Sequence, residues 1–70
     1  MEITLEKKRV TLSLKAARVN CELTLREAAD KLGVHVDTLG NYESKRTTPK
    51  YDIIVKMCHL YGVNLDDLRI

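Results

Sequence analysis

Four side chains of this sequence have the chemistry of metal ligands, namely Cys21, His35, Cys58 and His59. No two of them show the C-x-x-C or H-x-x-x-H spacing that brings ligands to one site, and the neighbours Cys58 and His59 project in different directions from one helix. No arrangement of Ser, His and Asp and no pair of carboxylates indicates a catalytic cleft. The sequence therefore predicts a protein that is not an enzyme and that needs no metal, cofactor or small-molecule ligand.

The segment 44–50, SKRTTPK, has a different chemistry. It contains Lys45, Arg46 and Lys50 together with hydroxyl side chains and no acidic residue. Cations in a loop are commonly just solvated, but three without a compensating acid favour contacts to phosphate. The net charge of +2 says little by itself, because twelve Lys and Arg stand against ten Asp and Glu. We interpret this segment as a basic loop.

The size and composition limit the classes of protein that need to be considered. A chain of 70 residues has room for one domain and little room for a buried catalytic cleft. With no Phe or Trp and only three Tyr, it lacks the aromatic rings on which many single-strand-binding proteins stack bases. Three Gly and one Pro are too few for many tight β-turns, so a mostly helical domain is predicted.

The cysteines and the hydropathy pattern bear on the compartment. Cys21 and Cys58 occur without a signal-like segment, so we expect two buried free thiols in a cytoplasmic protein. No apolar run approaches the length of a membrane-spanning helix, and no membrane association is expected.

Helix-capping residues and apolar spacing divide the rest of the chain into helices. Ser13 and Thr24 are good N-caps, Glu27 completes a capping box with Thr24, and Gly33 and Gly62 stand where helices end. The predicted helices cover about residues 14–21, 25–32, 36–44 and 51–60, with a last helical turn over 65–68. Residues 1–5 alternate apolar and polar like a strand, and residues 1–12 are expected to form an arm that either pairs with an edge, such as its copy in a second subunit, or stays mobile.

The second and third predicted helices are joined through the short segment Leu32-Gly33-Val34-His35. A connection this short requires a sharp turn between roughly perpendicular helices, which is the geometry of a helix-turn-helix. The residue types agree with that geometry: Ala29 is small where the helices cross, Gly33 suits a left-handed turn, and Val34 and Leu39 are apolar.

Four consecutive blocks, LKAARVN, TLREAADKLGV, TLGNYES and LYGVNLDDL, resemble those of the Cro and phage-repressor (XRE) family of helix-turn-helix proteins. The resemblance runs from about Ser13 to Leu68 and implies a compact, all-α, five-helix domain over residues 13–70. Two positions depart from the family pattern, since Leu25 stands where Gln is usual and Lys45 where Gly is common.

The resemblance implies that the third helix is a recognition helix and that its first two turns read base edges in the major groove. The implied base contacts are His35, Val36, Asp37 and Asn41. Asn41 is suited to adenine and Val36 to a thymine methyl group. Asp37 either accepts from cytosine or supports the helix N-terminus, and His35 is either a base reader or an ordinary surface residue.

The resemblance also places backbone contacts and one structural ion pair. The implied phosphate contacts, which include the basic loop, are Thr38, Ser44, Lys45, Arg46, Thr47 and Lys50. Gly40, lacking a side chain, could let the helix approach the sugar-phosphate backbone closely. Arg18 and Glu43 correspond to a buried ion pair that fixes the third helix against the first.

The sequence thus predicts a sequence-specific DNA-binding transcriptional regulator of phage or prophage type, which binds double-stranded DNA as a homodimer. The alternative is a protein-interaction module of the same fold, such as an antitoxin or an anti-repressor, with weak DNA binding. Leu25 in place of Gln and the near-neutral charge are the features that keep this alternative open.

Overall fold

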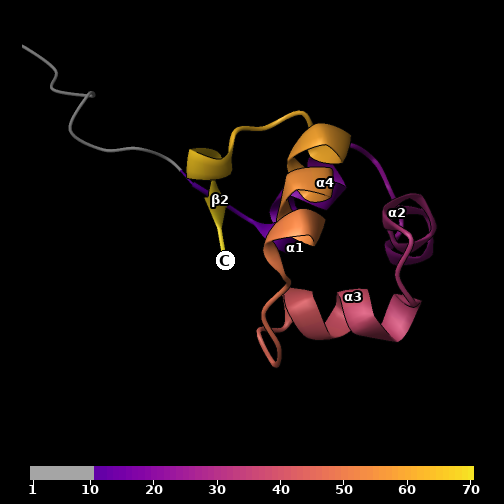
Figure 1. Ribbon diagram of the computed structural model, residues 1–70. Helices are drawn as coiled ribbons and strands as arrows, with labels where there is room; N and C mark the ends of the chain where they lie inside the picture. The colour runs from indigo at the N-terminus through magenta and orange to yellow at the C-terminus, as the bar shows by residue number, and fades with distance from the viewer. Residues whose placement is uncertain (1–10) are drawn as a thin grey trace, which may run out of the picture.

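A computed structural model of the protein describes residues 11–70, which contain four α-helices and two short strands (Figure 1). In chain order the elements are β1 (Leu12–Ser13), α1 (Leu14–Asn20), α2 (Leu25–Leu32), α3 (Val36–Glu43), α4 (Tyr51–Tyr61), the 3-10 helix η2 (Leu65–Asp67) and β2 (Leu68–Arg69). The four predicted α-helices are confirmed, with ends that agree to within one residue. Of the arm predicted for residues 1–12, residues 1–10, which include the strand pattern of residues 1–5, lie outside the described residues, and Leu12 is the first residue of β1.

The helix ends follow the capping signals of the sequence. Ser13 Oγ accepts from the Ala16 backbone N–H (3.0 Å) and begins α1. At α2 the Thr24 hydroxyl accepts from Glu27 N–H (3.1 Å), while the Glu27 carboxylate accepts from Thr24 N–H (2.9 Å). The capping bond from the Thr24 backbone lowers the pKa of Glu27. Gly33 (φ 76°) and Gly62 (φ 69°) adopt the left-handed conformation that ends α2 and α4.

The core lies where the four helices meet. Leu32, Leu39 and Met57, from α2, α3 and α4, are the largest side chains that are fully buried. Ala28 and Ala29 are buried, and α3 and α4 can pack closely on α2 because the side chain of Ala is only a methyl group. In Figure 1, α1 and α4 lie side by side and α3 runs across their ends.

The prediction of an all-α domain with five helices is wrong at the C-terminal end of the chain. Residues 65–67 form a single 3-10 turn, and the next two residues form β2, which pairs in parallel with β1 (Leu12 opposite Leu68, Ser13 opposite Arg69). Leu68 is buried there. The turn stops early because Leu68 gains both backbone hydrogen bonds to β1 and a place in the core.

The prediction of two buried thiols needs a smaller correction. Cys21 and Cys58 are free, as expected, but both are only half-buried. The Cys21 thiol contacts the Tyr61 carbonyl oxygen at 3.4 Å, and burial raises the pKa of the Cys58 thiol.

Candidate nucleic-acid interface

The helices α2 and α3 and the turn between them form the helix-turn-helix. Gly33 N–H donates to Asp30 O (3.2 Å) and Val34 N–H to Ala29 O (3.0 Å), so the turn folds back on the last residues of α2. Val34 packs against the core, and Leu39 is fully buried one turn into α3. These contacts hold α3 across the end of the helical bundle.

The inner face of α3 packs against the core, and its outer face is exposed to solvent. Val36, Leu39 and Tyr42 pack against or lie in the core. On the opposite side Asp37 is exposed, and Asn41, one turn later, is half-exposed. Within residues 11–70 the side-chain amide of Asn41 makes no hydrogen bond, so its donors and its acceptor are available to a ligand.

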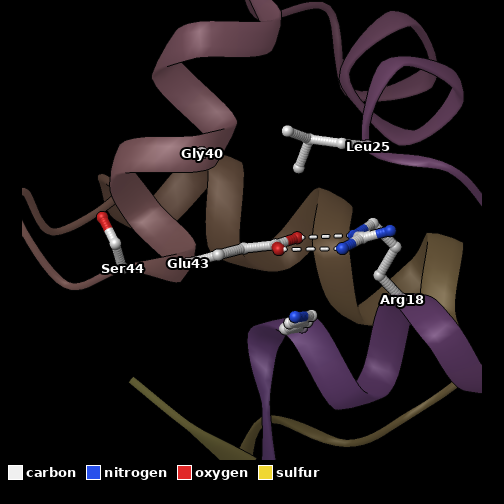
Figure 2. A pocket seen from close by; sticks show the side chains of 6 residues that line it. Arg18, Leu25, Gly40, Glu43 and Ser44 are labelled. Atoms are coloured by element: carbon white, nitrogen blue, oxygen red, sulfur yellow. Dashed lines mark hydrogen bonds and ion pairs between the residues drawn. The ribbon is translucent and has the colours of Figure 1, made fainter.

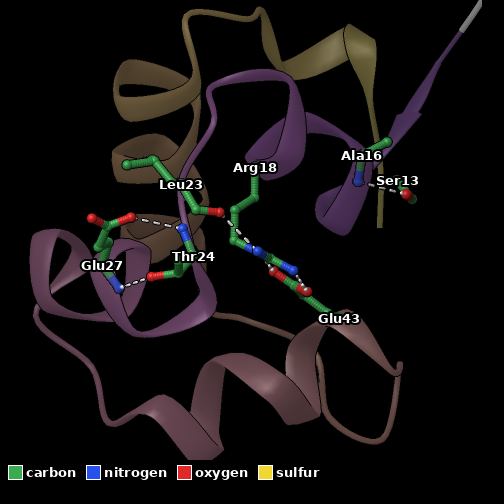
Figure 3. Close-up of polar contacts among 7 residues, drawn as sticks. All are labelled: Ser13, Ala16, Arg18, Leu23, Thr24, Glu27 and Glu43. Carbon is green, nitrogen blue, oxygen red and sulfur yellow. Dashed lines mark hydrogen bonds and ion pairs between the residues drawn. The ribbon is translucent and has the colours of Figure 1, made fainter.

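The structure brings Arg18 and Glu43 together between α1 and α3 (Figure 3). The guanidinium donates from Nε to Glu43 Oε2 (2.7 Å) and from Nη2 to Oε1 (3.1 Å), while Nη1 donates to Leu23 O (2.9 Å). Both side chains are nearly buried, with 11% and 8% of their surface exposed. The hydrogen bonds to Glu43 raise the pKa of Arg18.

Tyr61 is buried close to this ion pair. Burial first, and then the negative charge of Glu43, raise the pKa of Tyr61 to about 12. Its hydroxyl is the one buried side-chain polar atom among residues 11–70 that lacks a hydrogen-bond partner. The hydroxyl would be better solvated in water than in the core, and the apolar ring of Tyr61 is what favours its burial.

The basic loop follows α3 directly and folds back on it. Arg46 N–H (2.9 Å) and Thr47 N–H (3.4 Å) both donate to Asn41 O, and Ser44 Oγ donates to the same oxygen (3.3 Å). Lys45 adopts a left-handed conformation with φ 67°. The predicted phosphate contacts of the loop are exposed, Thr38 is half-exposed on α3, and Pro49 is buried and anchors the loop.

A model of the helix-turn-helix family matches residues 14–68 of this sequence. The chain belongs to the helix-turn-helix family. The resemblance to Cro and the phage repressors that the sequence blocks indicated is thereby confirmed. The matched residues run from the first residue of α1 to the first residue of β2, so this helix-turn-helix domain includes every described helix.

One characterised relative is the HTH-type transcriptional regulator ImmR of Bacillus subtilis (strain 168). The two sequences are 40% identical over 55 residues, which cover 79% of this chain and 43% of that regulator. The chain thus spans less than half of the length of that relative. No solved structure matches the chain at a significant level.

In this helix-turn-helix domain His35 is the N-cap of α3. Its Nδ1 accepts from Asp37 N–H (3.1 Å) and lies 3.8 Å from the Asp37 carboxylate. Both side chains are largely exposed, at 72% and 87%. The sequence analysis missed this capping role, although His35 stands directly before the first residue of the helix, where a capping side chain is expected.

A pocket that the sequence did not indicate opens beside the inner edge of α3 (Figure 2). It has a volume of about 460 Å³ and is lined by Lys15, Arg18, Leu25, Gly40, Glu43 and Ser44. Leu25, at the start of α2, points across it toward Gly40 of α3. The pocket is formed by α1, α2 and α3 together, so no local pattern could have revealed it.

The described part of the chain contains no group of three His, Cys, Asp or Glu side chains placed to hold a metal ion. No helix within residues 11–70 has the length and apolar character needed to cross a membrane.

Proposed function

We propose that this helix-turn-helix chain binds double-stranded DNA sequence-specifically and regulates transcription, with α3 in the major groove. The observation that carries the proposal is the outer face of α3, where the Asn41 amide, which makes no hydrogen bond within residues 11–70, lies one helical turn before the exposed basic loop. An α-helix with its side chains is about 10 to 12 Å in diameter, so a major groove about 12 Å wide admits α3. The loop then lies beside the groove wall.

The base contacts are assigned to the start and the outer face of α3. Asn41 offers an amide that pairs with adenine through two hydrogen bonds. Because Nδ1 of His35 accepts from the Asp37 backbone N–H, Nε2 is the ring nitrogen left to donate to an acceptor such as guanine N7. Val36 has part of its side chain free for a thymine methyl group. Asp37 supports the helix N-terminus, since a carboxylate near phosphates is repelled.

The phosphate contacts are assigned to hydroxyl and cationic side chains at the end of α3 and in the basic loop. They are Thr38, Ser44, Lys45, Arg46, Thr47 and Lys50. All but Thr38 are exposed, and the backbone bonds to Asn41 O hold the loop in a fixed position relative to the base-reading residue. Such contacts position the helix and add affinity that does not depend on sequence.

The proposal extends to the biological setting. The family resemblance supports a regulator of phage or prophage type that acts in the cytoplasm, without a cofactor, as a homodimer on a two-fold operator. A homodimer doubles the base contacts of a short recognition helix and matches the symmetry of such operators.

A second candidate is a protein-interaction module of the same fold. It is favoured by Leu25, which places an apolar side chain at the N-terminus of α2, where family members usually have an amide that holds a phosphate. On this alternative the fold is kept and DNA affinity is weak.

DNA binding to a labelled duplex at increasing salt distinguishes the two candidates. For the parent protein we expect binding at low salt that weakens steeply as salt rises, because phosphate contacts release counterions. Replacing both Lys45 and Arg46 with Ala removes two of these contacts, and the slope of log affinity against log salt should fall by about 1.8. The loss should be equal on specific and random duplexes.

The matched control replaces Lys56 and Arg69, which are exposed cations of α4 and β2, with Ala. It makes the same change in net charge outside the proposed interface and should leave the slope nearly unchanged. Equal slopes for the parent and the loop variant would remove the loop from the interface. A parent protein that fails to bind DNA at low salt would favour the interaction module.

A further inference from the structure

His35 caps the start of α3 with a ring nitrogen that can bind a proton. Its Nδ1 atom accepts from the Asp37 backbone N–H at 3.1 Å and so satisfies one of the N–H groups that a helix leaves free at its beginning. Only an unprotonated nitrogen can accept, because both ring nitrogens of a charged imidazole are donors. Histidine is the side chain that ordinarily changes its charge between about pH 5 and pH 8. The cap is therefore present in one protonation state of His35 and absent in the other.

The carboxylate of Asp37 is the acceptor that a protonated Nδ1 would meet. Its Oδ2 atom lies 3.8 Å from Nδ1, which is too long for a hydrogen bond but within the distance of an ion pair. The two side chains are 72% and 87% exposed, so both can turn toward each other without disturbing the core. On protonation Nδ1 can therefore exchange the Asp37 backbone N–H for the Asp37 carboxylate.

The charged groups on the neighbouring helices leave this pair to itself. The helices α1 and α2 pack against α3, and among residues 11–70 the ring forms an ion pair with Asp37 and with no acidic side chain of those helices. Asp30 and Lys31, in the last turn of α2 before His35, are both exposed. The other charged residues of the two helices are Lys15, Arg18, Arg26 and Glu27. Of these, Arg18 is bound to Glu43 and Glu27 to the N-cap of α2.

We propose that His35 makes DNA binding by α3 depend on pH, with the charged ring pairing with Asp37 and strengthening binding. The inference rests on the proposed function and assigns a regulation to its base-reading face. With His35 neutral, the exposed carboxylate of Asp37 stands unbalanced at the start of α3 and repels phosphate. With His35 charged, the added proton balances that carboxylate, while Nε2–H remains a donor to bases in both states. Acidification thus adds one positive charge to the proposed interface, and affinity should rise on specific and random duplexes alike.

The experiment measures the affinity of the full chain for a fluorescent random-sequence duplex at one low salt concentration, from about pH 8 down to about pH 5.5. The affinity of the parent should rise about three- to tenfold, which is the effect of about one phosphate contact. His35→Asn keeps a capping side chain that does not titrate, so its affinity should change less than about twofold over the same range. His59→Gln removes the other histidine of the sequence, which is exposed on α4, and should keep the rise seen in the parent.

NMR of the Asp37 backbone amide supplies a readout that does not depend on DNA. Its proton resonance should shift as the pH falls, because the hydrogen bond to Nδ1 is lost when the ring is protonated. The same resonance should stay nearly constant in His35→Asn.

Each other outcome overturns the inference and identifies what fails. If the parent binds the duplex without a rise at low pH, or if His35→Asn shows the same rise, His35 does not regulate binding and the proposed function stands. If the rise is lost in His59→Gln, the titrating group lies on α4. If the Asp37 resonance does not respond to pH in the parent, the ring does not exchange its partners. If the parent does not bind the duplex at any pH in low salt, both the proposed function and this inference fail.

Discussion

The inner face of α3 differs from its outer face in what holds the side chains in place. On the inner face Leu39 is fully buried, and Glu43 accepts two hydrogen bonds from Arg18. On the outer face Asp37 is exposed, and the amide of Asn41 has no partner within residues 11–70. Two residues of one helix, Asn41 and Glu43, thus have opposite environments.

This difference shows which substitutions should act on stability and which on binding. Changes on the inner face alter contacts that are present in the free protein, so they should lower the free energy of unfolding. A change to the Asn41 amide of the outer face removes no hydrogen bond within residues 11–70, so it should leave the free energy of unfolding nearly unchanged and alter DNA binding. The comparison would be contradicted by a variant that changes both the free energy of unfolding and DNA binding. It would also be contradicted by an inner-face variant that changes only DNA binding, or an outer-face variant that changes only stability.

The largest effect is expected for Arg18→Ala. The substitution leaves the carboxylate of Glu43 nearly buried without its partner and the Leu23 carbonyl without its donor, at a cost of about 3 kcal/mol. Urea denaturation measures the loss as a lower midpoint at constant m-value. A small domain has a total stability of about 5 to 15 kcal/mol, so the variant should still fold at low temperature.

The control for this prediction is the double variant Arg18→Met, Glu43→Leu. Replacing a buried ion pair with apolar side chains of similar volume is commonly neutral or stabilising, so the double variant should be clearly more stable than Arg18→Ala. Equal midpoints for Arg18→Ala and the parent would show that the pair is solvated.

The inner face was largely predictable from the sequence, and the reason is local. Thr24 and Glu27, Gly33 and the spacing of apolar residues such as Leu32 and Leu39 specify helix ends and buried positions within a few residues. The family resemblance supplied the pairing of Arg18 with Glu43, which no local pattern contains.

What the sequence did not reveal depends on contacts between distant segments. The strands β1 and β2 are two residues each and come from opposite ends of the described chain, so they have no periodicity to detect. The pocket beside Gly40 exists only where three helices meet. The left-handed conformation of Lys45 has no local signal, because Lys does not indicate positive φ, and only the Gly that is common at this position in the family points to it.

The second prediction concerns the outer face. Asn41→Ala should relax the preference for one base of each half-site by about 1 to 3 kcal/mol and leave non-specific binding almost intact. Thermal unfolding should change little, because the amide makes no hydrogen bond in the described part of the chain. Selection from a random-sequence pool measures the preference, and unchanged selectivity at every position would remove Asn41 from the base-reading set.

The smallest effect is expected for Lys45→Gly, in the basic loop that follows α3. Lys45 has φ 67°, a conformation that costs a residue with a side chain about 1 to 2 kcal/mol and costs Gly almost nothing. Part of this gain is offset because Gly has more freedom in the unfolded chain, so the net stabilisation should be about 0.5 to 1 kcal/mol. The same substitution removes one cation from the basic loop, and the salt slope of DNA binding should fall by about 0.9.

Glu22→Gly is the matched control, because Glu22 is the other described residue with a side chain and a positive φ (59°), and it lies between α1 and α2 outside the basic loop. It should give a similar gain in stability without lowering the affinity for DNA. If Lys45→Gly stabilises the protein and leaves the salt slope unchanged, the role of Lys45 is confined to the turn. If both variants are more stable and only Lys45→Gly lowers the salt slope of DNA binding, the backbone conformation at position 45 limits stability and the charge of Lys45 contributes to binding. Gly at this position would then lose the phosphate contact.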